Sequence, residues 1–579
     1  MDIKKISPFL SVSPQITTAD VGILAAQGYR TIICNRPDGE TDDQPTMASI
    51  RAAAERHGIR FHEQPVKSGQ VTDDDVARFA ALLGDAEGPV LAFCRTGTRS
   101  ITLWALSEAG HLSADSILAA AQSQGYDLEG LRGRLDERFR GPAGDERSAS
   151  ARSGARSIPT HDVVIVGGGA GGLAAAASLL QRQPGLDLVV IEPSERHYYQ
   201  PGWTLVGGGV FERARTERPM ADVMPRGAKW HRGAVAGFEP REHAVVLEDG
   251  ERIGYRVLVV APGIKLNWQA VDGLLDTLGR NGVTSNYMVD MAPYTWELVQ
   301  SLRGGRAVFT QPPMPIKCAG APQKAMYLSC DHWLRQGRLN DIDVAFHNAG
   351  GVLFGVPDYV PALERYVEKY GARVNFNENL KAVDGTAQRA WFDVTEGEKV
   401  TRKEVEFDML HVCPPQCAPD FVRSSPLADE AGWMKVSPET MAHPEYGNVF
   451  GLGDACSAPN AKTAAAVRKQ APVVAENVLA VLNGRAPRAV YDGYGSCPLT
   501  VERGKVVLAE FGYGGKLLPS FPRWVLDGRR PTTLGWMLKA HMMVPIYFDL
   551  MLKGREWLAA PKLLPHEPTP RDSRPACSP

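Results

Sequence analysis

The chain has 579 residues, of which 44% are hydrophobic, and this is more than one hydrophobic core usually holds. Its formal charge is −2 with both signs interspersed, which excludes the broad positive field that recruits nucleic acid. It has no apolar run of about 18 residues that could span a bilayer and no apolar signal-peptide core near its start. We therefore expect a cytoplasmic protein of two or three domains.

Residues 1–140 alternate short apolar runs with stretches of helical periodicity. The runs Thr31–Cys34 and Val90–Cys94 predict buried strands, and residues 72–83 and 100–109 predict helices. This alternation favours a small α/β sandwich.

The second of these strands leads directly into the segment Cys94-Arg-Thr-Gly-Thr-Arg99 and then into a helix. Successive backbone N–H groups and the N-terminus of that helix would converge on the sulfur of Cys94, and Arg95 and Arg99 add positive charge. Such a nest favours a thiolate and binds anions. We therefore predict that Cys94 is reactive.

This loop resembles those of the rhodanese sulfurtransferases and the cysteine phosphatases. Phosphatases place five residues between the cysteine and the arginine, whereas only four separate Cys94 from Arg99, and Phe93 replaces the usual phosphatase histidine. Residues 35–40 and 125–128 are similar to a bacterial family of phosphatase-like fold that is often described as sulfur transferases. The resemblance implies sulfur transfer, with phosphatase activity or a sensing role as the alternatives.

Small and polar residues dominate the stretch from 141 to 160, which predicts a flexible linker. A much larger segment follows it and begins with the apolar strand 162–166.

A glycine-rich loop follows this strand and contains Gly167, Gly169 and Gly172. These glycines permit a tight turn, a close approach of the backbone to a pyrophosphate, and close packing of the next helix on the strand. A second strand ends in Glu192, where an acid can bind a ribose hydroxyl pair. Together these features predict a dinucleotide-binding Rossmann domain.

Two later segments, 257–263 and 448–454, resemble the closing motifs of the FAD domain in flavoproteins that contain two dinucleotide-binding domains. The resemblance implies that the cofactor is FAD, with Gly263 in a tight turn and Asp454 at the ribityl chain. A second Rossmann unit is expected from the strand 306–310. Prolines follow that strand where a phosphate-binding glycine loop would stand, so we expect no nicotinamide site.

The segments 192–207, 317–324 and 462–467 resemble the sulfide:quinone oxidoreductase family, particularly its mitochondrial branch. The resemblance covers residues 162–564 and implies that hydrogen sulfide attacks a redox disulfide, that FAD stores the electrons, and that ubiquinone or another quinone accepts them. Glutathione, sulfite or a similar thiol would take the sulfane sulfur.

The same resemblance implies the redox cysteines. It assigns Cys318 directly. The second is expected at Cys456, although Ala455 separates this residue from the Gly-Asp motif. Lys462 is a candidate for a hydrogen bond to the flavin. The alternatives to Cys456 are Cys413, Cys417 and Cys330; Cys497 and the Cys413/Cys417 pair are interpreted as structural, and no metal site is expected.

Residues 534–553 are apolar, rich in methionine and aromatic residues, and interrupted by Pro545. Such a segment lies in a membrane interface without crossing it, in agreement with the docking segment of the family. We therefore predict a flavoprotein domain at 161–530 and a membrane and quinone segment at 531–579. The protein would bind the inner face of the cell membrane peripherally.

The fusion leads to a hypothesis in which Cys94 accepts sulfane sulfur that the large domain produces and passes it on. Two other functions remain open for the large domain. One is a type II NADH:quinone dehydrogenase, which the absence of a second glycine loop disfavours, and the other is a non-catalytic redox sensor.

Overall fold

The computed structural model describes residues 3–6, 10–41, 44–67, 69–84, 86, 88–109, 114–140 and 158–564. It divides the chain into two compact units, Met1–Ala155 and Arg156–Pro579. The boundary falls inside the stretch predicted as a linker. Most of that stretch (residues 141–157) and the tail from residue 565, with Cys577, lie outside the described residues.

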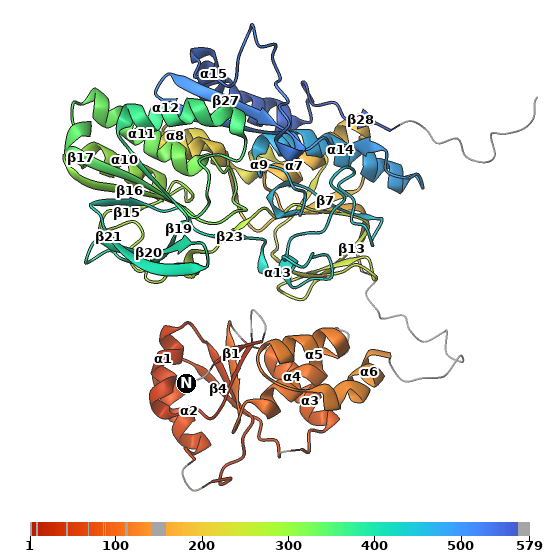
Figure 1. Cartoon of the computed structure of the whole chain (residues 1–579). Coiled ribbons are helices and arrows are strands. Elements are labelled where there is room, and N and C mark those ends of the chain that lie inside the picture. Colours follow the sequence, from red (N-terminus) through yellow and green to blue (C-terminus); the bar gives the residue numbers. More distant parts are fainter. Residues whose placement is uncertain are drawn as a thin grey trace, which may run out of the picture. The chain divides into compact units, whose positions relative to one another are not determined.

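The first unit is a five-stranded sheet with helices on both faces (Figure 1). The strand order is β1-β2-β5-β3-β4, and every neighbouring pair except β1–β2 is parallel. The strands are β1 Lys4–Lys5, β2 Leu10–Ser13, β3 Thr31–Cys34, β4 Arg60–Glu63 and β5 Val90–Phe93. The helices are α1 Thr18–Ala26, α2 Met47–Arg56, α3 Asp73–Gly84, α4 Thr98–Glu108, α5 Ala114–Ser123 and α6 Arg132–Arg140.

Two hydrophobic cores hold this sandwich together. One joins α1 and α2 to side chains such as Ile32 and Phe93, and the other joins α3, α4, α5 and α6 to side chains such as Ile33 and Ala92. Adjacent strand residues point to opposite faces of the sheet, so each strand serves both cores. The predicted α/β sandwich is confirmed.

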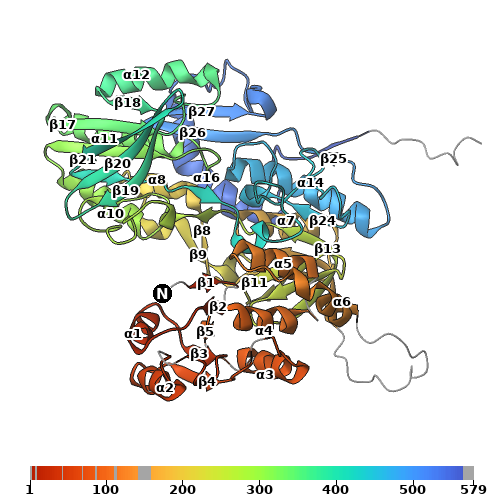
Figure 2. The ribbon, with the colours of Figure 1, turned by 60° about the horizontal axis from the view of Figure 1, so that its bottom comes forward.

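The second unit contains two Rossmann-type sheets. The first has the order β10-β7-β6-β13-β12-β11, and β24 pairs with β13 on its other side. Its strands are β6 Thr160–Val166, β7 Leu188–Ile191, β10 Lys229–His231, β11 Val235–Glu239, β12 Ala244–Leu247, β13 Arg252–Val260 and β24 Val449–Gly451. Helices α7 (Ala170–Arg182) and α14 (Ala464–Leu482) lie beside each other (Figure 2).

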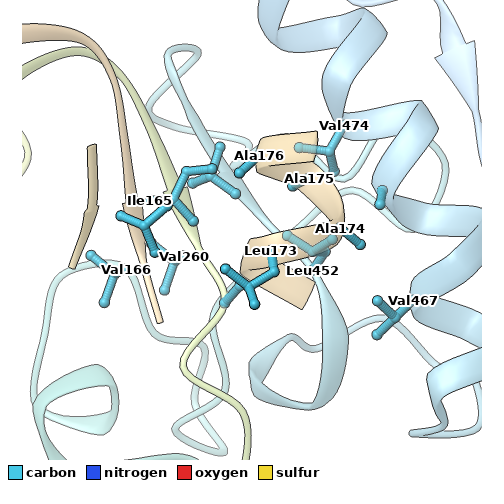
Figure 3. Packing of buried hydrophobic residues seen from close by; sticks show 14 of the residues in the cluster. Ile165, Val166, Leu173, Ala174, Ala175, Ala176, Val260, Leu452, Val467 and Val474 are labelled. Carbon is cyan, nitrogen blue, oxygen red and sulfur yellow. The ribbon is translucent and has the colours of Figure 1, made fainter. Parts of the chain in front are cut away.

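Figure 3 shows how α7 packs in this core. Leu173 and the alanines that follow it lie between Ile165 of β6 and Val474 of α14. Alanine side chains allow the helix to approach closely, which brings its N-terminus to the end of β6. The core thereby fixes the position of the glycine loop.

The second sheet is parallel, with the order β15-β22-β16-β17-β18. Its strands are β15 Val283–Thr284, β16 Gly305–Gln311, β17 Ile342–Asn348, β18 Arg373–Phe376 and β22 Met409–His411. The accompanying helices are α10 Met291–Ser301, α11 Ala321–Arg335 and α12 Val360–Tyr370. A meander of β19 Glu378–Asp384, β20 Arg389–Glu396 and β21 Lys399–Glu406 adjoins this sheet.

A hairpin of β26 (Gly495–Glu502) and β27 (Lys505–Phe511) precedes the C-terminal segment. That segment begins with α15 (Thr533–Met537) and continues through α16 (Met543–Pro545) in short helical turns up to Lys553. Within the described residues, no helix is both long and apolar enough to cross a membrane.

Short elements complete the second unit. They are α8 Trp203–Val206, α9 Met220–Val223, α13 Asp420–Arg423, β8 Arg196–Tyr198, β9 Glu217–Pro219, β14 Lys265–Leu266, β23 Gln416–Cys417, β25 Ala489–Val490 and β28 Lys562–Leu563.

Candidate active site: a cofactor cavity and two sulfur centres

The glycine loop after β6 has the geometry that a dinucleotide requires. Gly167 has a φ of 100°, and a Cβ on Gly172 would lie 1.8 Å from the carbonyl oxygen of Gly167. A Cβ on Gly169 would meet nothing within 4 Å, and this residue lines a cavity. Gly167 and Gly172 are therefore needed for folding, whereas Gly169 presents bare backbone to the cavity.

Glu192 stands at the end of β7 and lines the same cavity. Its Oε2 accepts a hydrogen bond of 2.7 Å from the backbone N–H of Gly168, and its Oε1 accepts one from Ser194. These bonds fix the carboxylate beside the glycine loop, in the place where an acid binds ribose hydroxyls.

The cavity has a volume of about 470 Å³ and extends from the glycine loop to Cys318 and the C-terminal segment. It also contains Gly263, whose φ of 80° makes the turn after β13, and Asp454. Burial raises the pKa of the Asp454 carboxyl, while the charges of Lys462 and Lys317 act in the opposite direction.

Lys462 lies at the cavity wall just before α14. Its Nζ donates to the carbonyl oxygens of Asp454 and Cys456, and burial lowers its pKa. These hydrogen bonds hold the ammonium group at the Gly-Asp turn. Its Nζ lies 4.0 Å from the centre of the Trp433 ring.

The cavity wall offers polar atoms that the surrounding protein leaves without a hydrogen bond. They are Nδ2 and Oδ1 of Asn286 and Nε1 of Trp203. Buried polar atoms normally have partners, so these atoms fit a site whose bound group supplies them. With the glycine loop, Glu192 and Asp454, the residues present fit FAD.

Cys318 lies between β16 and α11, where a nicotinamide-binding Rossmann unit would have its glycine loop. Its backbone N–H donates to the backbone carbonyl oxygen of Lys462 across 2.9 Å, and its φ is 50°. A left-handed conformation is unfavourable for a cysteine and is maintained by the surrounding structure. This places the thiol at the cavity wall.

The sulfur of Cys318 lies 3.4 Å from the sulfur of Cys497, which belongs to β26. A Cβ on Gly320 would lie 2.7 Å from the Cys497 sulfur, so this glycine makes room for the pair. A disulfide needs a sulfur–sulfur distance of about 2 Å. The two thiols are therefore close enough to form one with a small movement.

Two lysines place positive charge at this pair. Nζ of Lys324 lies 3.0 Å from the Cys318 sulfur, and Lys539 of the C-terminal segment is also buried nearby. A hydrogen bond from the Cys497 thiol, followed by the charge of Lys324, lowers the pKa of Cys318 well below its usual value. The same hydrogen bond raises the pKa of Cys497. Cys318 is therefore the thiolate of the pair.

Burial also changes the lysines around the pair. It lowers the pKa of Lys539 to about 7, and the neighbouring charge of Lys324 contributes. Burial likewise lowers the pKa of Lys317 to about 8, and its Nζ lies near the rings of Trp203 and Tyr287. The sulfur pair thus has a permanent ammonium neighbour in Lys324 and a second neighbour, Lys539, that titrates near neutral pH.

The expected pairing of Cys318 with Cys456 stays a prediction. The thiol of Cys456 donates to the carbonyl oxygen of Gly453, and burial raises its pKa to about 11. Cys497, interpreted as structural from the sequence, becomes a second candidate partner because its sulfur lies 3.4 Å from that of Cys318. Because 179 positions separate Cys318 from Cys497, only folding brings them together; the Ser-Cys-Pro-Leu motif around Cys497 was the available signal.

The three alternatives to Cys456 occupy other environments. Cys330 and Cys413 are buried, which raises the pKa of both thiols, that of Cys413 to about 12. Cys417 is partly exposed in β23, whose partner strand is β14. Within the described residues, no sulfur–sulfur contact joins any of these three cysteines to Cys318.

The first unit contains the other sulfur centre. Cys94 directly follows β5 and is buried, and its sulfur accepts a hydrogen bond of 3.1 Å from the backbone N–H of Gly97. Gly97 has a φ of 87° and is the N-cap residue directly before α4, so the helix N-terminus faces this loop. Arg99 is buried and paired with Glu40, whereas Arg95 is exposed. The structure thus places Arg99, but not Arg95, within the buried part of the loop.

Comparisons with known proteins divide the chain at the same place. Residues 2–111 match the family of the beta-lactamase hydrolase-like protein, phosphatase-like domain, and residues 161–291 match the pyridine nucleotide-disulphide oxidoreductase family. The beta-lactamase hydrolase-like protein of Xylella fastidiosa is 38% identical over 130 residues, which cover 22% of this chain and 30% of that protein.

The second unit has long relatives. The mitochondrial sulfide:quinone oxidoreductase of Dictyostelium discoideum is 41% identical over 372 residues, which cover 64% of this chain and 80% of that protein. The crystal structure of the sulfide:quinone oxidoreductase of Aquifex aeolicus is 18% identical, with a TM-score of 0.56, and the match covers 69% of this chain and 92% of that one. At this identity, the structural similarity supports the fold alone.

Proposed function

The chain belongs to the sulfide:quinone oxidoreductase family, and we propose that the sulfur pair Cys318 and Cys497 is its redox centre. The chain is an FAD-binding enzyme that oxidises hydrogen sulfide and reduces quinone. The observation that carries the proposal is the 3.4 Å contact between the two sulfurs at the wall of the cofactor cavity.

The cycle begins with a disulfide between Cys318 and Cys497. Hydrosulfide attacks the Cys497 sulfur, the bond between the two cysteines breaks, and Cys497 becomes a persulfide while Cys318 leaves as a thiolate. Cys318 suits the leaving role because the Lys324 ammonium group, 3.0 Å from its sulfur, stabilises its negative charge. A good leaving thiolate speeds this exchange.

An acceptor thiolate then removes the sulfane sulfur from Cys497 and leaves two reduced cysteines. Reoxidation of the two thiolates to the disulfide releases two electrons, which restores the starting state. The two protons of quinol are those that hydrogen sulfide and the acceptor thiol lose when they become the attacking anions. Bound FAD would supply the acceptor for these electrons and the donor to quinone. Overall, sulfide, an acceptor thiol and quinone yield a persulfide and quinol.

The C-terminal segment supports entry of quinone from a membrane surface. Leu538, Met543, Ile546 and Tyr547 line the cofactor cavity. Large apolar side chains of the same region are exposed, including Trp524 (87%), Leu534, Met537, Met542 and Trp557. A segment that is apolar on its outside and open to the cavity suits peripheral membrane binding on the cytoplasmic side.

Anaerobic titration of the purified holoenzyme tests the redox assignment. We expect sulfide to bleach the flavin absorbance and decylubiquinone to restore it. Bleaching by NADH and no response to sulfide would contradict the assignment and favour an NADH:quinone dehydrogenase. Flavin reduction without turnover would favour a sensor.

We further propose that Cys94 carries sulfane sulfur from the flavoprotein unit, or from a released persulfide, to an acceptor such as glutathione or sulfite. The observation that supports this proposal is the buried Cys94 thiol, which accepts a backbone hydrogen bond beside a helix N-terminus and Arg99. The four-residue spacing to Arg99 favours sulfur over a phosphate monoester. We expect Cys94→Ala to lose transfer of sulfane sulfur to sulfite; retained transfer, or phosphatase activity in the wild type, would contradict this role.

A further inference from the structure

An ion pair in the first unit connects two motifs that lie 59 residues apart. Nη1 of Arg99 donates to Oε1 of Glu40 across 2.7 Å, and Nη2 donates to Oε2 across 2.8 Å. Both oxygens of one carboxylate thus bind the outer edge of the guanidinium group. Such two-bond pairing fixes orientation as well as charge.

The hydrogen bonds of Arg99 can be counted. A guanidinium group has five N–H bonds, and Nη1 uses its second one on the carbonyl oxygen of Val66, 2.8 Å away. These three bonds leave one N–H on Nε and one on Nη2. Those two N–H bonds are parallel and share the remaining edge of the planar group.

Arg99 also interacts with the thiol of Cys94. Burial alone would lower the pKa of Arg99, but the hydrogen bonds and charges of Glu40 and Cys94 outweigh it and raise that pKa. Only 8% of the Arg99 side chain is exposed, so the group has little freedom to turn. Its position between Glu40 and Cys94 is therefore fixed.

A second arginine holds Glu40 itself. Nε of Arg36 lies 3.0 Å from Oε2 of Glu40, and the remaining nitrogens of Arg36 donate to Gln15 and Thr41. The Arg36 side chain is 4% exposed. The hydrogen bond from Arg99, followed by that from Arg36, lowers the pKa of Glu40, so Glu40 is a carboxylate at neutral pH.

We propose that Glu40 is a positioning residue of the Cys94 site. It binds the outer edge of Arg99, which leaves the Nε and Nη2 edge available to the Cys94 thiol and to an anion bound in the loop. The inference deepens the sulfur-carrier role proposed above and rests on it for its biological meaning, whereas anion binding by the loop can be measured without sulfur transfer.

The test measures how well sulfate protects Cys94 from iodoacetamide in the full-length protein, with alkylation followed by peptide mass spectrometry. Glu40→Gln removes the bidentate ion pair with Arg99, and we expect the sulfate concentration that gives half protection to rise about tenfold. Glu40→Asp keeps the charge but shortens the reach, and we expect a smaller rise. Arg99→Lys keeps a positive charge but has no planar guanidinium group, and we expect the half-protecting sulfate concentration to rise at least as much as in Glu40→Gln.

Glu129→Gln is the matched control, because it removes the same charge from an exposed ion pair with Arg132. It should leave sulfate protection unchanged. A purely structural role for Glu40 would lower the melting temperature of Glu40→Gln and leave its protection constant at the wild-type value, which would overturn the proposal. Tighter sulfate binding in Glu40→Gln would also overturn it, since Glu40 would then compete with the anion.

Loss of sulfane transfer is measured separately. Weaker sulfate protection in Glu40→Gln together with no sulfane transfer by the wild type would support the positioning role and contradict the sulfur-carrier role. The two ideas can therefore fail independently.

Discussion

The two sulfur centres surround a cysteine with different parts of the protein. Cys94 lies in a strand-to-helix loop, where a backbone N–H group and an anchored arginine surround one thiol. Cys318 lies at a cofactor cavity, where a lysine ammonium group is 3.0 Å away and a second thiol is 3.4 Å away. We propose that the neighbouring thiol allows Cys318 to store two electrons in a disulfide, whereas the single thiol of Cys94 carries a sulfur atom.

The largest effects should come from the redox pair. Cys318→Ser and Cys497→Ser each prevent the disulfide, so we expect sulfide-dependent quinone reduction to fall at least about 1,000-fold. Cys456→Ser is the matched control, with kcat expected within about twofold of the wild type. Inactive, FAD-loaded Cys456→Ser beside active Cys497→Ser would reverse our assignment.

Removal of the Lys324 charge should have the next largest effect. In Lys324→Met the pKa of Cys318 rises, because the ammonium group 3.0 Å from its sulfur is lost. We expect alkylation of Cys318 at pH 7 to slow about 10-fold in the reduced protein. Lys369→Met, which removes a more exposed lysine paired with Glu502, serves as the control. Equal rates in the two variants would show that Lys324 does not support the thiolate.

Lys539 should give a smaller effect that depends on pH. Its pKa is about 7, so its positive charge is present below pH 7 and is lost as the pH rises through that value. We expect Lys539→Gln to slow Cys318 alkylation about threefold at pH 6 and to have little effect at pH 8.5. A slowing that is equal at both pH values would contradict a titrating role.

Substitution of the other centre should have the smallest effect on the redox reaction. Cys94→Ala leaves the cofactor cavity intact, so we expect sulfide-dependent quinone reduction within about twofold of the wild type. Quinone reduction measured with excess sulfite tests this. A tenfold loss would show that Cys94 takes part in the redox cycle, and the separation of the two centres would then be wrong.

Local patterns in the sequence predict the α/β sandwich and the dinucleotide-binding loop, whereas FAD and the role of Cys318 are implied by the resemblance to the family. Glycine spacing, strand length and helix periodicity are properties of neighbouring residues, and the structure has the corresponding elements at Gly167–Gly172 and around Cys94. The comparisons confirm the family and its cofactor.

The partner of Cys318 depends on tertiary structure. Cys456 is near the flavin motif in sequence, but the turn at Gly453 directs its thiol to a backbone carbonyl group. Cys497 comes from a hairpin that packs on α11, and Lys539 comes from a segment still farther along the chain. Glu40 is a similar case, because only the sheet brings β3 and β5 together.

Non-reducing peptide mapping of the air-oxidised, FAD-loaded protein tests the central assignment most directly. Digestion without reductant, followed by mass spectrometry, identifies which cysteine is linked to Cys318. We predict a cross-linked peptide pair that contains Cys318 and Cys497, with Cys456 recovered as a free thiol. A peptide pair that contains Cys318 and Cys456 would contradict this account.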